Sequence, residues 1–344
     1  MALATAPAEK AASEAPPPAP RRRVALRANV ILILRILAAN PLTLIGFILV
    51  VIISITALLI VIVPPISMLV LGHSVSILPY PALDVGAFPI FQGPSLAHWA
   101  GTDQAGSDVF SNILAALPTD LGIGFVVAGI SLVIGTLLGL IAGFYDTAGT
   151  LSAAASVGIL RLTDIFLSFP TLVLALAITA AWGRGEFYSE LAVIVTWWPF
   201  YVRLTRGEVL SIKVQPYVTA ARAAGLPERT ILFRHVVRNL LEPLIVYFSL
   251  DVGTVIVTYS TISYVGVGVP PNIPEWGNLM YSYQDYVLSA PWTVWSVTAA
   301  IFITVLAFSL LGDGLRDILD PRSRRIMSTT AVATAVAPST GERP

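Results

Sequence analysis

The amino-acid sequence predicts an all-α, polytopic membrane protein with six transmembrane helices. The first reason is composition, because 56% of the 344 residues are hydrophobic and only 12% are charged, about half the charged fraction of soluble domains. The second is a mean hydropathy of +0.81. The third is a series of apolar segments of roughly 20 residues, the length that a helix needs to cross a bilayer. Cysteine is absent, which excludes disulfides and thiolate chemistry.

The predicted spans are long enough to cross a hydrocarbon core of about 30 Å. In chain order they are Pro41 to Val63, Leu121 to Gly143, Leu162 to Trp182, Leu191 to Leu210, Leu244 to Tyr264 and Val294 to Leu311. The segments 64–120 and 265–293 are rich in proline, glycine and aromatic residues. This composition favours ordered, helix-poor loops outside the bilayer.

The distribution of basic residues predicts the orientation. When both termini are placed in the cytoplasm, every one of the 20 Lys and Arg residues except Arg184 falls in an inner segment. Inner loops of membrane proteins are enriched in these residues. The segment 211–241, between the fourth and fifth spans, is therefore expected to face the cytoplasm.

The two ends of the chain are predicted to be disordered cytoplasmic tails, at 1–23 and 326–344, because they are small, polar or proline-rich. Residues 24–40 predict an amphipathic helix at the inner interface, with Arg27 and Arg35 among apolar residues. The same arginines interrupt the apolar stretch, which argues against a secretory signal.

The first outer loop contains the segment GTDQAGSDVF, residues 101–110. Its acids and threonine fit a metal or catalytic site, but capping and turn formation is the favoured interpretation. On that interpretation Ser107 or Asp108 caps a short helix over 109–117, which Pro118 ends. The histidines are scattered, and no Ser/His/Asp arrangement supports catalysis. The candidate residues of this segment are Gly101, Thr102, Asp103, Gly106 and Asp108.

Ionisable residues within the predicted spans are candidates for function, because charge in a membrane costs at least a few kcal/mol. Asp251 lies in the fifth span and Asp164 near the inner end of the third, while Arg203 and Arg206 lie toward the inner end of the fourth. They suit either a proton or substrate relay or interhelical pairs, and we favour the pairs.

Aromatic residues in the fourth span allow two interpretations. Trp197 and Trp198 precede Pro199, which predicts a kink. Packing against lipid or the protein core is the favoured role of the two tryptophans.

The segment Tyr217 to Leu241 is too polar to cross a bilayer. Pro216 begins a run of helix formers that Gly225 ends, because glycine readily adopts positive φ. Pro227 suits the first turn of a second helix, with apolar residues on one face and arginines on another. The sequence therefore predicts a short helix, a glycine turn and an amphipathic helix that returns to the membrane.

This segment resembles the EAA loop of ATP-binding-cassette importer permeases, with Thr219-Ala220-Ala221 in place of Glu-Ala-Ala and Gly225 in the glycine position. Other segments resemble the dipeptide and oligopeptide (nickel) branch. GTDQAGSDVF is similar to its GTDxxGRD element, with Ser107 in place of Arg. The remaining similar segments are Arg161 to Ala177, Gly266 to Gly277 and Leu310 to Arg322, while Ala115 to Leu121 lacks the basic residue usual before the second span.

The resemblance implies a six-helix, type I importer permease, the C-type subunit, in the inner or plasma membrane of a prokaryote. It implies four partners besides lipid: a homologous permease, two cytoplasmic ATPases that hold ATP and Mg, and an extracytoplasmic binding protein. Nucleic acid is not expected. A helix in the EAA loop would dock into an ATPase, where larger side chains would clash and Arg222 would pair with an acid. The implied coupling residues are Tyr217, Thr219, Ala220, Ala221, Arg222, Gly225 and Pro227.

The chain carries no Gly-x-x-x-x-Gly-Lys-Ser/Thr motif, and neither Lys10 nor Lys213 follows a glycine-rich turn. It is therefore expected to be a transport subunit rather than an enzyme, with no cofactor of its own. Two alternatives remain, an ion-coupled secondary transporter, which needs paired ion sites and internal halves, and a membrane scaffold. The cargo is open among peptides, oligosaccharides and nickel chelates.

Overall fold

The computed structural model describes residues 40–145, 151–183 and 185–319. The tails predicted at 1–23 and 326–344 lie outside these residues. So does the predicted interfacial helix at 24–40, except for Asn40, which caps the first described helix by accepting a hydrogen bond from the backbone N–H of Leu42.

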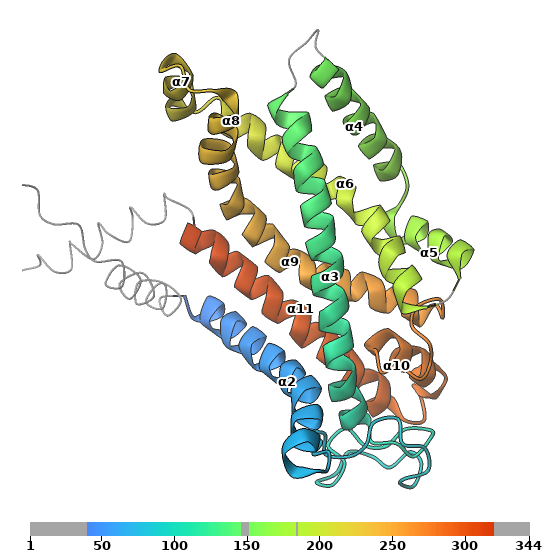
Figure 1. Cartoon of the computed structure of the whole chain (residues 1–344). Coiled ribbons are helices and arrows are strands. Elements are labelled where there is room, and N and C mark those ends of the chain that lie inside the picture. Colours follow the sequence, from blue (N-terminus) through green and yellow to red (C-terminus); the bar gives the residue numbers. More distant parts are fainter. Residues whose placement is uncertain (1–39, 146–150, 184, 320–344) are drawn as a thin grey trace, which may run out of the picture.

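The described part of the chain is built of helices, with an isolated bridge between Thr102 and Asp108. Long helices lie side by side, with the loop 72–108 at one end of the bundle and helix α7 at the other (Figure 1). The helices are α2 Pro41–Leu71, α3 Val109–Phe144, α4 Leu151–Leu167, α5 Thr171–Trp182, α6 Glu186–Lys213, α7 Pro216–Ala223, α8 Glu228–Ile231, α9 Val237–Tyr264, α10 Trp276–Tyr283 and α11 Pro291–Leu319. A π-helical turn, Leu232–Val236, joins α8 to α9, and a 3-10 turn, Gln284–Tyr286, follows α10.

The all-α membrane fold is confirmed. Among the described residues, four helical segments are long and apolar enough to cross a membrane: α2, α3, α11 and the continuous stretch Glu228–Tyr264. The bent pair α4 and α5 makes a fifth if it forms one span. Helix α6 has 28 residues but is less apolar than these, so the count of six spans stays a prediction.

Helix α3 corrects the prediction that Pro118 ends a short helix. The helix is continuous from Val109 to Phe144 with Pro118 inside it. Proline removes one backbone hydrogen bond from a helix interior. Its neighbours Leu117 and Leu121 are buried in the core, and this packing stabilises the helix through the proline.

The third predicted span, Leu162 to Trp182, is not one straight helix. Helix α4 ends at Leu167 and α5 begins at Thr171, and the two axes are bent by 86°. Pro170 lies in the break. Because proline disfavours helical backbone at the residue before it, Phe169 cannot easily continue α4, and the Ser168-Phe169-Pro170 sequence was the signal for this break.

Close packing of α3 on α6 depends on glycines four residues apart. A Cβ atom on Gly135 would lie 2.3 Å from Cβ of Tyr201, and one on Gly139 would lie 2.6 Å from Cβ of Thr205. Small residues at this spacing let helix backbones approach closely in membranes. The contact fixes Tyr201 of α6 in the interior of the bundle, where it is fully buried.

The outer segments contain more helix than we predicted. The segment 64–120 is helical at both ends, because α2 runs to Leu71 and α3 begins at Val109. Within 265–293 the chain forms α10, whose N-cap is Glu275. The Glu275 carboxylate accepts hydrogen bonds from the backbone N–H groups of Gly277 and Asn278, at 2.8 Å each, which is how an acidic cap stabilises a helix start.

Candidate functional site

The short helix α7 has the predicted shape. Pro216 occupies its first turn, and Gly225 follows it with φ of +78°. The N–H of Leu226 donates to the carbonyl of Ala221 at 3.2 Å, and the N–H of Gly225 donates to that of Arg222 at 2.9 Å. This pair of bonds is the Schellman motif, which glycine permits because it adopts positive φ without strain.

The two faces of α7 differ sharply in burial. Val218 is fully buried and Ala221 is 8% exposed, and both pack in a cluster with residues of α6 and α9. Tyr217, Thr219 and Ala220 are exposed. Ala221 therefore anchors α7 to its own bundle, and its predicted role in coupling stays a prediction.

Contacts within the chain tie α7 to the helix that follows it. Arg222 donates to the carboxylate of Glu228, with Nε to Oε1 at 2.9 Å and Nη2 to Oε2 at 3.4 Å. The rings of Tyr217 and His235 lie 6.3 Å apart between centroids. We expected Arg222 to pair with an acid on a partner, whereas its acidic neighbour here belongs to the same segment.

The segment that follows α7 continues into the interior of the bundle. Residues Glu228–Tyr264 form one helical stretch in which the π-helical turn Leu232–Val236 joins α8 to α9. Asp251 lies on α9, about six turns beyond Glu228 at 3.6 residues per turn. The chain therefore links α7 to Asp251 through a continuous helix.

Asp251 makes the interhelical contact that we favoured. Trp197 Nε1 and the hydroxyl of Tyr201, both on α6, each donate to Asp251 Oδ2 at 2.7 Å. Asp251 is 9% exposed. Sequence reasoning assigned Trp197 to packing and did not identify Tyr201 as a partner, because nothing local in the sequence shows which faces of α6 and α9 meet.

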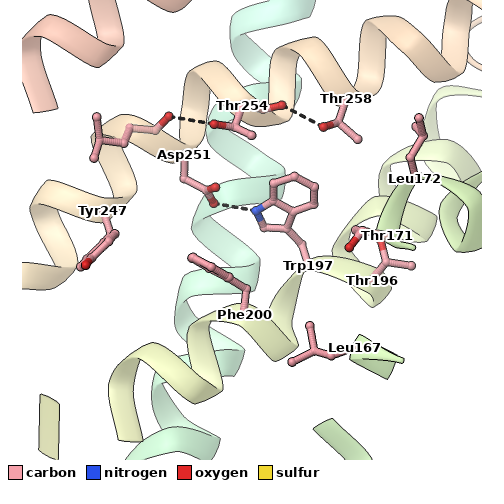
Figure 2. Close-up of a pocket in the computed structure, with 11 residues that line it drawn as sticks. Leu167, Thr171, Leu172, Thr196, Trp197, Phe200, Tyr247, Asp251, Thr254 and Thr258 are labelled. Atoms are coloured by element: carbon pink, nitrogen blue, oxygen red, sulfur yellow. Dashed lines mark hydrogen bonds between the residues drawn. The ribbon is translucent and has the colours of Figure 1, made fainter. Parts of the chain in front are cut away.

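A cavity of about 470 Å³ adjoins Asp251. Its lining residues come from α4, α5, α6 and α9. Figure 2 shows Asp251, Thr254 and Thr258 along one helix of the wall, with Trp197 and Phe200 on a neighbouring helix. The walls are predominantly apolar with a few polar groups, as in cavities that accept small molecules.

Asp164 also has an interhelical partner. Arg203 Nη2 lies 2.7 Å from Asp164 Oδ1, and both side chains are about half exposed within the chain. An ion pair with this exposure to water contributes about 0–1 kcal/mol. Asp164 and Asp251 therefore have separate partners, and the structure does not bring them together as one relay.

The motif at residues 101–110, predicted to lie in an outer loop, is held by its own hydrogen bonds. Asp108 is the residue that caps α3, because its Oδ2 accepts from the backbone N–H of Ser111 at 2.8 Å and from the Ser111 hydroxyl at 2.7 Å. Asp108 Oδ1 lies 2.8 Å from His98 Nδ1. The sequence shows only that the histidines are scattered, and it did not predict this contact. The serine contacts the aspartate rather than the histidine, so this arrangement does not activate a serine nucleophile.

Asp103 organises the turn that precedes α3. Its Oδ1 accepts from the backbone N–H groups of Ala105 and Ser107, at 2.8 and 2.9 Å, and its Oδ2 accepts from the Tyr283 hydroxyl at 3.2 Å. Burial raises the pKa of Asp103 despite these donors. The carboxylate thereby joins the outer loop to α10.

Thr102 and the two glycines complete the motif. The Thr102 hydroxyl donates to the carbonyl of Pro89 at 2.7 Å, and its carbonyl accepts from Trp292 Nε1 of α11 at 3.2 Å. Gly101 and Gly106 both have φ of +70°. All five predicted residues of the motif are buried. In the described part of the chain, no group of three or more His, Cys, Asp or Glu side chains converges as a metal site.

Sequence reasoning missed a pair of buried acids. Asp120 of α3 and Glu275 are 1% and 0% exposed, and their carboxyl groups share a hydrogen bond. The backbone N–H of Trp276 donates to Asp120 Oδ2 at 3.1 Å. Burial raises the pKa of Glu275.

Comparison with known proteins places this helical architecture in a family. Residues 135–325, which include α6, α7 and Asp251, match the profile described as the binding-protein-dependent transport system inner membrane component. The chain belongs to this family. It is therefore the membrane permease of an ATP-binding-cassette importer.

Relatives of the permease resemble most of the described chain. A glutathione transport system permease protein of Pectobacterium atrosepticum is 39% identical over 231 residues, covering 67% of this chain and 75% of that protein. A probable D,D-dipeptide transport system permease protein of Escherichia coli is 40% identical over 230 residues, with coverage of 67% and 75%. A dipeptide transport system permease protein of Alkalihalophilus pseudofirmus is 37% identical over 233 residues, with coverage of 68% and 75%.

Proposed function

We propose that the permease carries short peptides across the inner membrane of a prokaryote, powered by two separate ATPase subunits, one of which docks on α7. The exposed face of α7 is the observation that carries this proposal. It includes the small residues Thr219 and Ala220, on a helix whose other face is anchored to the bundle. A partner that binds this face would explain why the motif is exposed.

The peptide cargo is supported by the relatives. The three named above transport, by their descriptions, glutathione, a D,D-dipeptide or a dipeptide. All three cargoes are short peptides or peptide-like molecules. Oligosaccharides and nickel chelates find no counterpart among these relatives.

The path of force runs from α7 to the cavity. Arg222 and Glu228 hold α7 against α8, and the helical stretch from Glu228 to Asp251 spans roughly 35 Å at 1.5 Å per residue. Closure of the ATPases would displace α7, and the continuous helix would tilt with it. A shift of this kind switches a packed bundle between inward-open and outward-open arrangements.

The proposed orientation follows from charge. The α7 end carries the basic residues of segment 211–241, so it faces the cytoplasm together with both termini. The loop 72–108 and α10 then face outward, where a binding protein would deliver the peptide. A homologous permease would complete the pathway, and ATP and Mg would bind to the ATPases.

Uptake of labelled trialanine into vesicles tests the source of energy. We expect uptake only when the ATPase subunits are co-expressed and ATP is supplied, and we expect it to persist after ionophores collapse the ion gradients. Gradient-driven uptake without the ATPases would instead support an ion-coupled carrier. Vesicles that contain the permease alone are the control.

Cross-linking tests the docking surface directly. Because the chain has no cysteine, Ala220→Cys provides a single thiol on the exposed face of α7. A bifunctional thiol reagent should link it to an ATPase subunit. Leu288→Cys is the matched control. Leu288 is 96% exposed and lies between α10 and α11, and α10 is far from α7 along the bundle (Figure 1), so this thiol should give no such product.

A further inference from the structure

The Asp251 carboxylate has one oxygen in use and one free. Both donors from α6 reach Oδ2, whereas no hydrogen bond from the described residues reaches Oδ1. Asp251 is 9% exposed, and it lines the cavity of about 470 Å³. An ionisable group at such a position is costly unless it has a role, and a free carboxylate oxygen attracts hydrogen-bond donors.

The hydroxyls beside Asp251 also present acceptors. The Thr254 hydroxyl donates to the carbonyl of Leu250 at 3.3 Å, and the Thr258 hydroxyl donates to that of Thr254 at 2.9 Å. Each proton is thus committed to the helix backbone, while the oxygen lone pairs remain available. Figure 2 shows both hydroxyls following Asp251 along the wall of the cavity.

The rest of the lining favours a cation. Trp197, Phe200 and Tyr247 contribute aromatic rings, whose faces attract ammonium groups. The residues that line the cavity include no Lys, Arg or His, so Asp251 has no basic neighbour in the lining to neutralise it.

A second hollow along α6 and α9 also contains carboxylates. Tyr247 lines both the Asp251 cavity and a hollow of about 450 Å³ that contains Glu208 and Glu242 together with Arg316. Carboxylates therefore occur on both sides of Tyr247. A positively charged group moving along α6 and α9 would meet acidic side chains in succession.

We propose that the Asp251 cavity is a subsite for the protonated amino group of the transported peptide. The ammonium group would bind Asp251 Oδ1 and the oxygens of Thr254 and Thr258, beside the aromatic rings. Trp197 and Tyr201 are positioning residues, because their bonds to Oδ2 fix the carboxylate and leave Oδ1 toward the cavity. This inference rests on the proposed peptide transport and specifies the part of the peptide that is recognised.

The charge of the cavity can be measured without transport. In the assembled importer, Thr254→Cys places the single thiol of this chain one helical turn from Asp251. The measured quantity is the rate of modification by a cationic methanethiosulfonate divided by the rate for an anionic one. We expect this ratio to be about tenfold higher in Thr254→Cys than in the double variant that also carries Asp251→Asn. Leu288→Cys corrects for the intrinsic reactivities of the reagents. An unchanged ratio in the double variant would overturn the proposal.

Protection of the same thiol identifies the ligand. Trialanine should slow modification of Thr254→Cys, whereas N-acetyl-trialanine, which lacks the ammonium group, should protect at least tenfold less well. Adding Asp251→Asn should remove the difference between the two peptides. Equal protection by both peptides, or protection by sodium ions alone, would contradict an ammonium subsite.

The outcomes separate this inference from the proposed function. If ATP-dependent trialanine uptake is present but the protection shows no preference for the free amino group, the subsite is wrong and the importer stands. If the charge ratio and the protection follow Asp251 while uptake requires no ATPase, the subsite stands and the proposed energy source is wrong. Tyr201→Phe removes one of the two donors that fix the carboxylate and keeps its charge. The variant should retain the cationic preference but discriminate less between trialanine and N-acetyl-trialanine, and unchanged discrimination would contradict the positioning role of Tyr201.

Discussion

Residues 101–110 and residues 216–227 both carry predicted motifs, but the chain uses them differently. In the outer motif Asp103 and Asp108 are 4% and 2% exposed, and their oxygens accept bonds from the chain itself. In the coupling segment one face is buried while Thr219, Ala220 and Gly225 are exposed. When the polar groups of a motif bond within the chain, the stability of the fold accounts for the motif. An exposed motif is better accounted for by binding to a partner.

The comparison is sharpest at two glycines with similar backbones. Gly106 and Gly225 have φ of +70° and +78°. A Cβ on Gly106 would lie 2.1 Å from the carbonyl oxygen of Phe88, whereas a Cβ on Gly225 would meet nothing within 4 Å. Gly106 is required both because its φ is positive and because a side chain would not fit. Gly225 is required only because its φ is positive.

Alanine at these two positions gives the largest expected difference. Gly106→Ala should cost about 3 kcal/mol, from left-handed strain plus overpacking, and Gly225→Ala about 1 kcal/mol, from strain alone. The measurement is the apparent melting temperature of the purified importer in detergent. Equal losses would show that the outer loop relaxes freely and would remove the distinction between the motifs.

Tryptophan at adjacent alanines compares the two faces of α7. Ala221→Trp should destabilise the protein by about 1–3 kcal/mol, because Ala221 is buried against Val218 and residues of α6 and α9. Ala220→Trp should change stability by less than about 0.5 kcal/mol, since Ala220 is exposed. Thermal unfolding followed by light scattering checks both. A destabilised Ala220→Trp would mean that this face packs within the chain.

The smallest effect concerns pH. Burial raises the pKa of Glu275 above its ordinary value of 4.5, so the native state holds the proton more strongly than the unfolded state does. The contribution of this proton to the free energy of unfolding is fully present below pH 4.5. It is lost as the pH rises through the pKa of Glu275 in the folded state. Apparent melting temperature should therefore fall between pH 5 and pH 8.

Glu275→Gln should flatten this dependence, because its amide is uncharged throughout the range. Glu228→Gln is the matched control in the coupling segment, since the Glu228 side chain is 55% exposed and its removal should leave the slope unchanged. A wild-type profile that rises over this range would contradict a pKa of Glu275 that burial raises.

Local features of the sequence predicted much of the coupling segment. Pro216, Gly225 and Pro227 mark helix boundaries through their own backbone preferences, and the structure confirms the short helix and the turn. Asp108 was predicted as a cap together with the alternative Ser107, and the structure shows that Asp108 is the cap. Such features depend on neighbours within a few residues, which the sequence displays directly.

Features set by distant contacts were predicted poorly. The bond from Trp197 to Asp251 joins residues 54 positions apart, and the burial of Ala221 depends on packing against α6 and α9. Pro118 continues a helix because the core around it stabilises the helix more than the lost bond weakens it. These outcomes depend on which helix faces meet, and hydrophobic periodicity does not specify partners across a bundle.

ATP-driven uptake by the Ala220→Trp variant tests the central claim most directly. The variant should insert normally, melt like wild type and retain the affinity of the complex for its binding protein, yet transport trialanine at least tenfold more slowly per assembled complex. That result would show that the exposed face of α7 transmits force from the ATPase. Uptake at the wild-type rate, with the tryptophan in place, would contradict the account.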